Sequence, residues 1–246
     1  MALVIGSAPD ALMAKNWNLS EFTHRIAINN SWQITPEWNY LVYPEDFLAE
    51  RLPSAPLKPG QKLIPASEFV PTQNSMGGFV YAGGTMAFTA AYWTLGALKP
   101  NIIAFLGCDM IYTASEGESN HFYGHGTSDP LRADITLQSL EAKSVRFMAI
   151  ANALNCAVVN LSELTSSRLL FPRISRNDLL RSEFFEALLS KQNLALNLDN
   201  VKKALAAEKA LGYMVSSGKY WHHLQDLNAA KLKQIDDLWL QAMRLN

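Results

Sequence analysis

The 246-residue sequence lacks several features that would assign a function class directly. Neither sign of charge dominates, because 21 basic residues stand against 22 acidic ones and give a net charge of −1. Such a balance gives no electrostatic reason to expect a nucleic-acid partner. No apolar run reaches the roughly 20 residues of a membrane span, and the N-terminus lacks the basic and long apolar regions of a signal peptide. We therefore expect a cytoplasmic protein with no transmembrane segment.

Cysteine and the common nucleotide and metal motifs are also scarce. Cys108 and Cys156 lie in separate apolar segments. Two isolated cysteines do not form a disulfide framework, so both are expected to be reduced and buried. The sequence contains no Walker motif and no Asp-x-Asp, the motif through which many nucleotide-sugar transferases hold a divalent metal. A transferase with this sequence is therefore expected to work without a metal or another cofactor.

Apolar segments and turns alternate along the first two thirds of the chain. Strands are expected over residues 2–5, 25–28, 40–43, 62–64, 101–106 and 157–159, and helices over residues 45–52, 86–97 and 133–154. Residues 65–78 are polar and are expected to be irregular. This alternation predicts an α/β fold with a Rossmann-like, mostly parallel sheet and helices on both faces, in a domain of residues 1–165.

The last third of the sequence contains no strand candidate. Amphipathic segments at residues 184–189, 200–211 and 228–245 predict helices, so residues 166–246 are expected to form a helical C-terminal extension or cap. Contacts in a homo-oligomer and peripheral contact with the inner membrane face remain open alternatives for this extension.

Small and polar residues follow three of the expected secondary-structure elements. The first strand ends in Gly6, Ser7, Ala8 and Pro9, the second ends in Asn29 and Asn30, and Gly83, Gly84 and Thr85 precede the apolar helix at 86–97. Small residues let a ligand approach the backbone, a following helix attracts anions, and amides can pair with a base or a sugar. Ordinary turns are the alternative interpretation.

The segment after the fifth strand is rich in titratable and phenolic side chains. It contains Asp109, Tyr112, His121, Tyr123 and His125. A histidine there could act as a general base and the phenols could donate to a leaving phosphate. The two histidines are spaced i, i+4, as in some zinc sites, but Gly124 and Gly126 argue against the helix that such a site needs. The alternatives are a surface histidine and half-buried core tyrosines.

Over residues 3–162, the order of these motifs resembles the bacterial sialyltransferases that use CMP-sialic acid, glycosyltransferase family 42. The most specific match is the family's His-Tyr-Ile-Gly-His-Ser loop, which here reads His-Phe-Tyr-Gly-His-Gly over residues 121–126. The family's opening Gly-Asn-Gly-Pro-Ser turn corresponds to residues 6–10, and its Thr-Ser-Gly turn corresponds to residues 83–85. Ser7, Tyr43 and Gly84 depart from the family at nucleotide-contact positions, which leaves the identity of the donor open.

The resemblance implies an inverting transfer from a CMP-activated sugar donor to a glycan acceptor. His125 would be the general base, and Tyr112 and Tyr123 would stabilise the departing phosphate. Asn29 and the turn at residues 83–85 would hold the nucleotide. The chain also resembles, more distantly, the 6-hydroxymethylpterin diphosphokinase-like proteins, which would need magnesium at acidic residues such as Asp109. A non-catalytic nucleotide- or sugar-binding relative is a third alternative.

Overall fold

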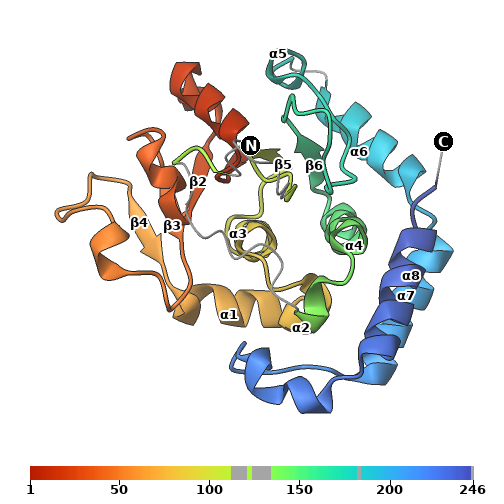
Figure 1. Cartoon of the computed structure of the whole chain (residues 1–246). Helices are drawn as coiled ribbons and strands as arrows, with labels where there is room; N and C mark the ends of the chain where they lie inside the picture. The colour runs from red at the N-terminus through yellow and green to blue at the C-terminus, as the bar shows by residue number, and fades with distance from the viewer. Residues whose placement is uncertain (112–120, 124–133, 182–183, 245–246) are drawn as a thin grey trace.

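The computed structural model describes residues 1–111, 121–123, 134–181 and 184–244. These residues form a six-stranded sheet in which every pair of neighbouring strands is parallel, in the order β4-β3-β2-β1-β5-β6 (Figure 1). The strands are β1 (Ala2–Ile5), β2 (His24–Ile28), β3 (Tyr40–Val42), β4 (Lys62–Ile64), β5 (Ile102–Leu106) and β6 (Ala157–Asn160). The predicted α/β fold with a Rossmann-like parallel sheet is confirmed.

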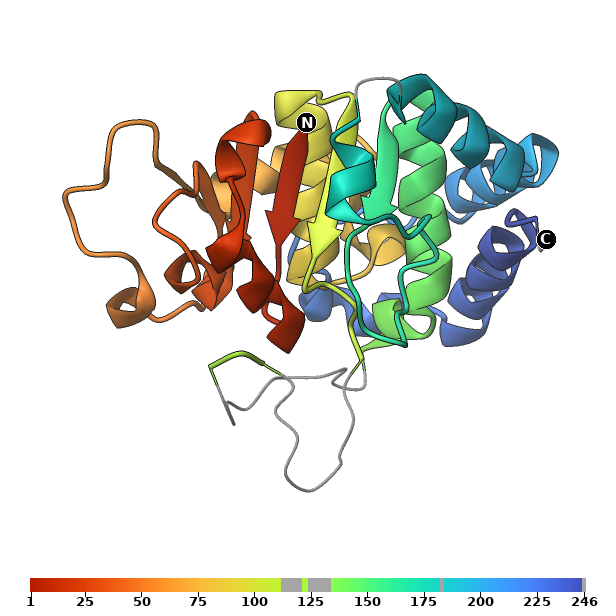
Figure 2. The ribbon, with the colours of Figure 1, turned by 90° about the horizontal axis from the view of Figure 1, so that it is seen from above.

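The strand order reverses at β1, which pairs with β2 on one side and with β5 on the other. Ile5 is in register with Ala27 of β2 and with Leu106 of β5, so the three strands end at nearly the same level. In Figure 2 the strand arrows point toward the edge of the sheet where residues 107–111 leave β5. This edge is the topological switch point at which open α/β sheets bind ligands.

Helices cover both faces of the sheet. The α-helices are α1 (Ala66–Asn74), α2 (Gly78–Ala82), α3 (Met86–Trp93), α4 (Leu140–Ala153), α5 (Arg176–Leu179), α6 (Phe184–Ala195), α7 (Leu198–Leu211) and α8 (Ala229–Gln241). The 3-10 helices are η1 (Pro9–Asn16), η2 (Leu19–Glu21), η3 (Asn29–Gln33), η4 (Ala49–Arg51), η6 (Ile135–Leu137) and η7 (Tyr220–Asp226), and η5 (Thr94–Leu98) is a π-helix. Helices α3 and α4 pack on one face, and η1, α5 and α6 pack on the other (Figure 1).

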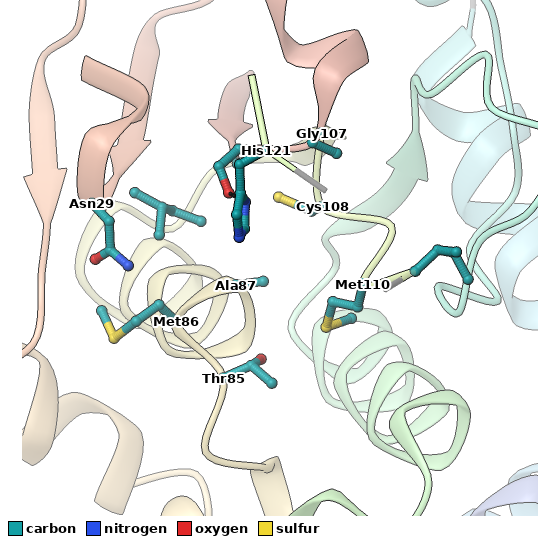
Figure 3. Close-up of a pocket in the computed structure, with 13 residues that line it drawn as sticks. Asn29, Thr85, Met86, Ala87, Gly107, Cys108, Met110 and His121 are labelled. Carbon is teal, nitrogen blue, oxygen red and sulfur yellow. Dashed lines mark hydrogen bonds between the residues drawn. The ribbon is translucent and has the colours of Figure 1, made fainter. Parts of the chain in front are cut away.

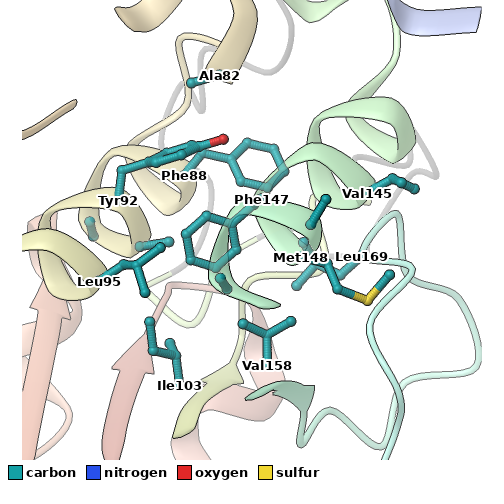
Figure 4. Close-up of a cluster of buried hydrophobic side chains, with 14 of the residues drawn as sticks. Ala82, Phe88, Tyr92, Leu95, Ile103, Val145, Phe147, Met148, Val158 and Leu169 are labelled. Atoms are coloured by element: carbon teal, nitrogen blue, oxygen red, sulfur yellow. The ribbon is translucent and has the colours of Figure 1, made fainter. Parts of the chain in front are cut away.

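The core between α3, α4 and the sheet is rich in aromatic side chains (Figure 4). Tyr92 and Phe147 meet edge to face with ring centroids 5.0 Å apart, and Phe105 lies 6.0 Å from Phe147 in the same geometry. Ile103 and Val158 of the sheet are buried beneath them. Edge-to-face pairs add about 0.5–1.5 kcal/mol to the burial of apolar surface, so this cluster fixes α3 and α4 against the strands.

The C-terminal helices α7 and α8 pack outside α4 and are joined to it by buried ion pairs. Arg146 Nε lies 2.8 Å from Glu208 Oε1 of α7, and Lys143 Nζ lies 2.5 Å from Asp236 Oδ1 of α8. All four side chains are almost fully buried. The predicted helical C-terminal extension is therefore present, and it shares a continuous hydrophobic core with the sheet domain.

Two predictions of local structure before α2 were wrong. The expected helix at residues 45–52 is only the short η4, because this mostly exposed segment lies between two prolines and buries no side chain of η4 against the core. The expected irregular chain at residues 65–78 instead contains α1. Pro71 lies inside that helix, and burial of Phe69 against Phe79 outweighs its poor helical propensity.

Two predicted helices were right in position and wrong in extent. The helix expected over residues 133–154 begins at Leu140, because the side chains of Asp134 and Ser139 cap two separate elements, η6 and α4. The helix expected over residues 86–97 is α-helical only to Trp93 and continues as the π-helix η5.

The predictions for the cysteines are confirmed, since both are free thiols and buried. Within the described residues, no helix is both long and apolar enough to cross a membrane.

Candidate functional site

A pocket lies at the switch point, beyond the carboxyl ends of β1, β2 and β5 (Figure 3). Its walls come from the turns after these three strands, from the first turn of α3 and from His121. The described residues that line it are Gly6, Ser7, Ala8, Ile28, Asn29, Thr85, Met86, Ala87, Gly107, Cys108, Met110, Ile111 and His121. Segments far apart in the sequence therefore meet at the edge where this fold binds ligands.

The turn after β1 forms a rigid wall of the pocket. The Gly6 N–H donates to the Leu106 carbonyl at 2.8 Å, and the Ala8 N–H donates to the Gly107 carbonyl at 3.0 Å. A Cβ on Gly6 would lie 2.2 Å from that Gly107 oxygen, so the close approach requires glycine. These two amides are thus occupied, and the 3-10 helix η1 replaces the expected anion-attracting helix.

His121 is held against this turn by two contacts with Ser7. Ser7 Oγ and His121 Nδ1 are hydrogen-bonded at 2.7 Å, and the Phe122 N–H donates to the Ser7 carbonyl at 2.9 Å. Burial lowers the pKa of His121 below its ordinary value, so the imidazole is neutral at pH 7. The Tyr123 ring stacks on His121 with centroids 4.9 Å apart and the rings nearly parallel. Tyr123 is 41% exposed and does not line the pocket.

Asn29 lines the pocket at the end of β2. Its φ of 51° is in the left-handed region that asparagine tolerates better than most residues. Its side-chain oxygen is buried and accepts no hydrogen bond from the described residues. Buried acceptors without partners are rare in folded proteins, and this oxygen is too enclosed for a ligand to reach unless the side chain turns. Asn30 is buried behind Asn29 and does not line the pocket.

The first turn of α3 forms the opposite wall. Thr85 is the N-cap, and its side chain accepts from the Phe88 N–H at 3.3 Å. The N–H groups of Met86 and Ala87 have no partner within the helix, because the first turn of any helix leaves them free for an external acceptor. Gly83 and Gly84 lie behind this turn and do not line the pocket. The Gly84 N–H donates to Thr136 Oγ1 at 3.1 Å.

Asp109 does not line the pocket and instead makes a buried contact with β6. It is 1% exposed, and Asn160 Nδ2 of β6 donates to its Oδ1 at 3.0 Å. Its Oδ2 is buried and has no hydrogen-bond partner among the described residues. Asp10 lies near enough for the Asp109 charge to act on it. Burial raises the pKa of Asp10, and the nearby Asp109 charge adds to this effect.

The structure thus brings together six of the predicted site residues in one pocket. These are Gly6, Ser7, Ala8, Asn29, Thr85 and His121. Pro9, Asn30, Gly83, Gly84, Asp109 and Tyr123 lie near it and do not line it. The predicted catalytic residues Tyr112 and His125 lie outside the described residues.

Sequence reasoning missed the apolar part of the lining, which includes Ile28, Met86 and Met110. The alternating strand pattern could have indicated Ile28, and the N-cap at Thr85 could have indicated the two residues after it. Met110 has a φ of 54°, which no sequence pattern signals for methionine.

The described lining contains no lysine, arginine, aspartate or glutamate. Among the described residues, no three His, Cys, Asp or Glu side chains are placed to hold a metal ion. An anionic ligand would therefore depend on the first turn of α3 and on neutral donors.

Comparison with known proteins gives no relative: no family model matches the chain, and no curated protein or solved structure is significantly similar to it.

Proposed function

We propose that the chain is a glycosyltransferase that binds a CMP-activated sugar in the switch-point pocket and transfers the sugar to a glycan acceptor. The observation that carries the proposal is the convergence of three groups on this pocket. They are the side-chain amide of Asn29, the first turn of α3 at Thr85, and His121. Together they offer contacts to a base, a phosphate and a sugar.

The lining limits how the donor phosphate can be held. A CMP-linked sugar carries one negative charge on its phosphodiester, and CMP-sialic acid carries a second on its sugar carboxylate. Without a basic side chain in the described lining, the first turn of a helix contributes about 0.3–1 kcal/mol per anionic contact. The donor phosphate would therefore be held mainly by main-chain N–H groups and neutral side chains.

The chemistry of the proposal comes from the resemblance to the CMP-sialic-acid-dependent family. His125 takes the proton of the acceptor hydroxyl as its oxygen attacks the anomeric carbon. The bond from that carbon to the CMP phosphate oxygen breaks, and CMP leaves with the electron pair. Tyr112 donates a hydrogen bond to the leaving phosphate. His121, neutral and fixed by Ser7, orients the donor in the pocket.

The nucleotide site can be tested by thermal shift on the full chain with CMP, CDP, UDP, GDP and ATP. A ligand at 100 times its Kd stabilises the folded state by about 2.7 kcal/mol, a rise of roughly 5–11 °C for a chain of this size. We expect the largest rise with CMP. No rise with any of the five nucleotides would refute the proposal.

Asn29 and Asn155 provide a matched pair of variants for this assay. Both have φ near +50° and tolerate glycine, which adopts that conformation freely. Asn29→Gly removes a polar side chain from the pocket lining and is expected to reduce the CMP-induced shift. Asn155→Gly, at an exposed position after α4, is expected to leave the shift unchanged.

The environment of Asp109 and Asp10 favours a second candidate, a diphosphokinase-like activity. Asp109 Oδ2 has no partner among the described residues, and the Asp109 charge acts on Asp10. These oxygens are the kind that magnesium prefers. Stabilisation by ATP only in the presence of magnesium, lost in Asp109→Asn, would favour this candidate over sugar transfer.

A further inference from the structure

A chain of hydrogen bonds runs from the C-terminal extension to the glycine turn before α3. The Tyr220 hydroxyl of η7 donates to Asp134 Oδ2, and the Thr136 hydroxyl donates to Asp134 Oδ1 at 2.7 Å. The Gly84 N–H donates to Thr136 Oγ1 at 3.1 Å. An ionised carboxylate only accepts, so both hydroxyls must donate to Asp134, and Thr136 keeps a lone pair for the Gly84 amide.

The Tyr220 hydroxyl occupies space that is open only because residue 84 has no side chain. A Cβ built on Gly84 would lie 1.9 Å from the Tyr220 hydroxyl oxygen. Glycine at this position is therefore what allows the Tyr220 side chain to reach Asp134. Gly84 and Tyr220 are more than a hundred positions apart in the sequence, so their contact exists only in the folded protein.

The chain of hydrogen bonds ends at Gly84, next to the pocket. Gly84 directly precedes Thr85, the N-cap of α3, and Thr85, Met86 and Ala87 line the pocket. Tyr220 is 4% exposed and Thr136 is fully buried, so water cannot easily replace these bonds. An amide held in this way fixes where the first turn of α3 begins and where its free N–H groups point.

We infer that Tyr220 is a positioning residue for the nucleotide site, which acts through Asp134 and Thr136 on the amide of Gly84. The inference rests on the proposed function, because it concerns the turn that would hold the donor phosphate. It assigns to the C-terminal extension a role in ligand affinity in addition to packing.

The test compares three hydroxyl deletions in the full chain. Tyr220→Phe and Thr136→Val each break the chain of bonds and are expected to weaken CMP binding about three- to tenfold, measured by calorimetry well below the unfolding midpoint. Thr136→Ser keeps the hydroxyl and is expected to restore binding. Tyr213→Phe is the matched control, because its hydroxyl accepts from the Asn228 N–H elsewhere in the same extension. It is expected to leave affinity unchanged.

Amide hydrogen exchange of the free protein provides a second measurement that needs no nucleotide. The Gly84 amide is expected to exchange faster in Tyr220→Phe and Thr136→Val than in the wild type or in Tyr213→Phe. Because Tyr220 acts on the Gly84 amide only through Asp134 and Thr136, the double variant is expected to lose less affinity than the product of the two single losses.

The outcomes separate this inference from the proposed function. If the wild type binds CMP and both deletions bind it equally well, the inference is overturned and the proposed function stands. Equal loss of affinity in Tyr213→Phe would also overturn it, since a general loosening of the extension would then be the cause. If the wild type binds none of the nucleotides, the proposed function is refuted, and so is the inference that rests on it.

Discussion

Replacing Glu208 with glutamine tests whether the buried ion pairs hold the C-terminal helices to the sheet domain. Glu208 Oε1 accepts from Arg146 Nε at 2.8 Å and from Trp239 Nε1 at 2.7 Å, and its Oε2 accepts from Arg146 Nη2 at 2.9 Å. Glutamine has nearly the same shape but only one acceptor oxygen and no charge. Glu208→Gln therefore leaves the Arg146 guanidinium, 1% exposed, without its counter-ion.

The expected magnitude follows from this burial. Removing one partner of a buried ion pair costs about 3–5 kcal/mol, because the remaining charge stays out of water. Arg146 keeps its bonds to the Tyr92 hydroxyl at 2.6 Å and to the Met76 carbonyl at 2.8 Å, which favours the lower part of that range. For a chain of this length, the loss corresponds to a drop in the unfolding midpoint of roughly 6–20 °C.

The assay is denaturant unfolding followed by far-ultraviolet circular dichroism, with two comparison variants. Asp237→Asn removes an exposed ion pair to Lys233 and is expected to change the free energy of unfolding by less than about 0.5 kcal/mol. The double variant Arg146→Met, Glu208→Leu removes both buried charges and is expected to be more stable than Glu208→Gln. A loss below about 1 kcal/mol in Glu208→Gln, or a double variant less stable than Glu208→Gln, would refute the reasoning.

Three further predictions concern the site and its titration. His125→Ala is expected to abolish sugar transfer while the CMP-induced thermal shift remains; an unchanged transfer rate would rule out His125 as the general base. Because burial lowers the pKa of His121, its contribution to stability is present above its ordinary pKa of 6.5 and is lost as the pH falls below that value. His121→Gln should remove this part of the pH dependence, measured as the unfolding midpoint between pH 5 and 8. Because burial raises the pKa of Asp10, ionisation destabilises the fold as the pH rises above the ordinary value of 3.8, so Asp10→Asn should raise the midpoint more at pH 7 than at pH 4.

The strands could be predicted from the sequence because a parallel sheet covered on both faces needs continuous apolar segments. Every residue of β1 and of β5 is buried, and such segments stand out in any sequence. Helix α1 could not be predicted, because its polar composition and Pro71 indicate loop and only the packing of Phe69 makes it helical. The intrinsic helix propensity of a segment has little influence on its structure when tertiary contacts supply most of the stability of the helix.

The site was predictable only where it consists of turns at strand ends. Ser7, Asn29 and Thr85 follow or precede elements whose ends meet at one edge of the sheet, so topology alone brings them together. The contact between Tyr220 and Asp134 has no local signal, since it depends on how the C-terminal extension folds back. Contacts of this kind follow from three-dimensional packing, and no periodic pattern of residues in the sequence signals them.

Two departures from the sialyltransferase pattern can be explained by contacts within this chain. Ser7 stands where the family has asparagine, and its hydroxyl bonds to His121 and fixes the imidazole at the pocket. Gly84 stands where the family has serine, and any Cβ there would collide with Tyr220. In both places the residue present in this chain makes a contact of its own beside the pocket. A difference from the sialyltransferase pattern at these two positions is therefore no evidence for or against the proposed sugar transfer.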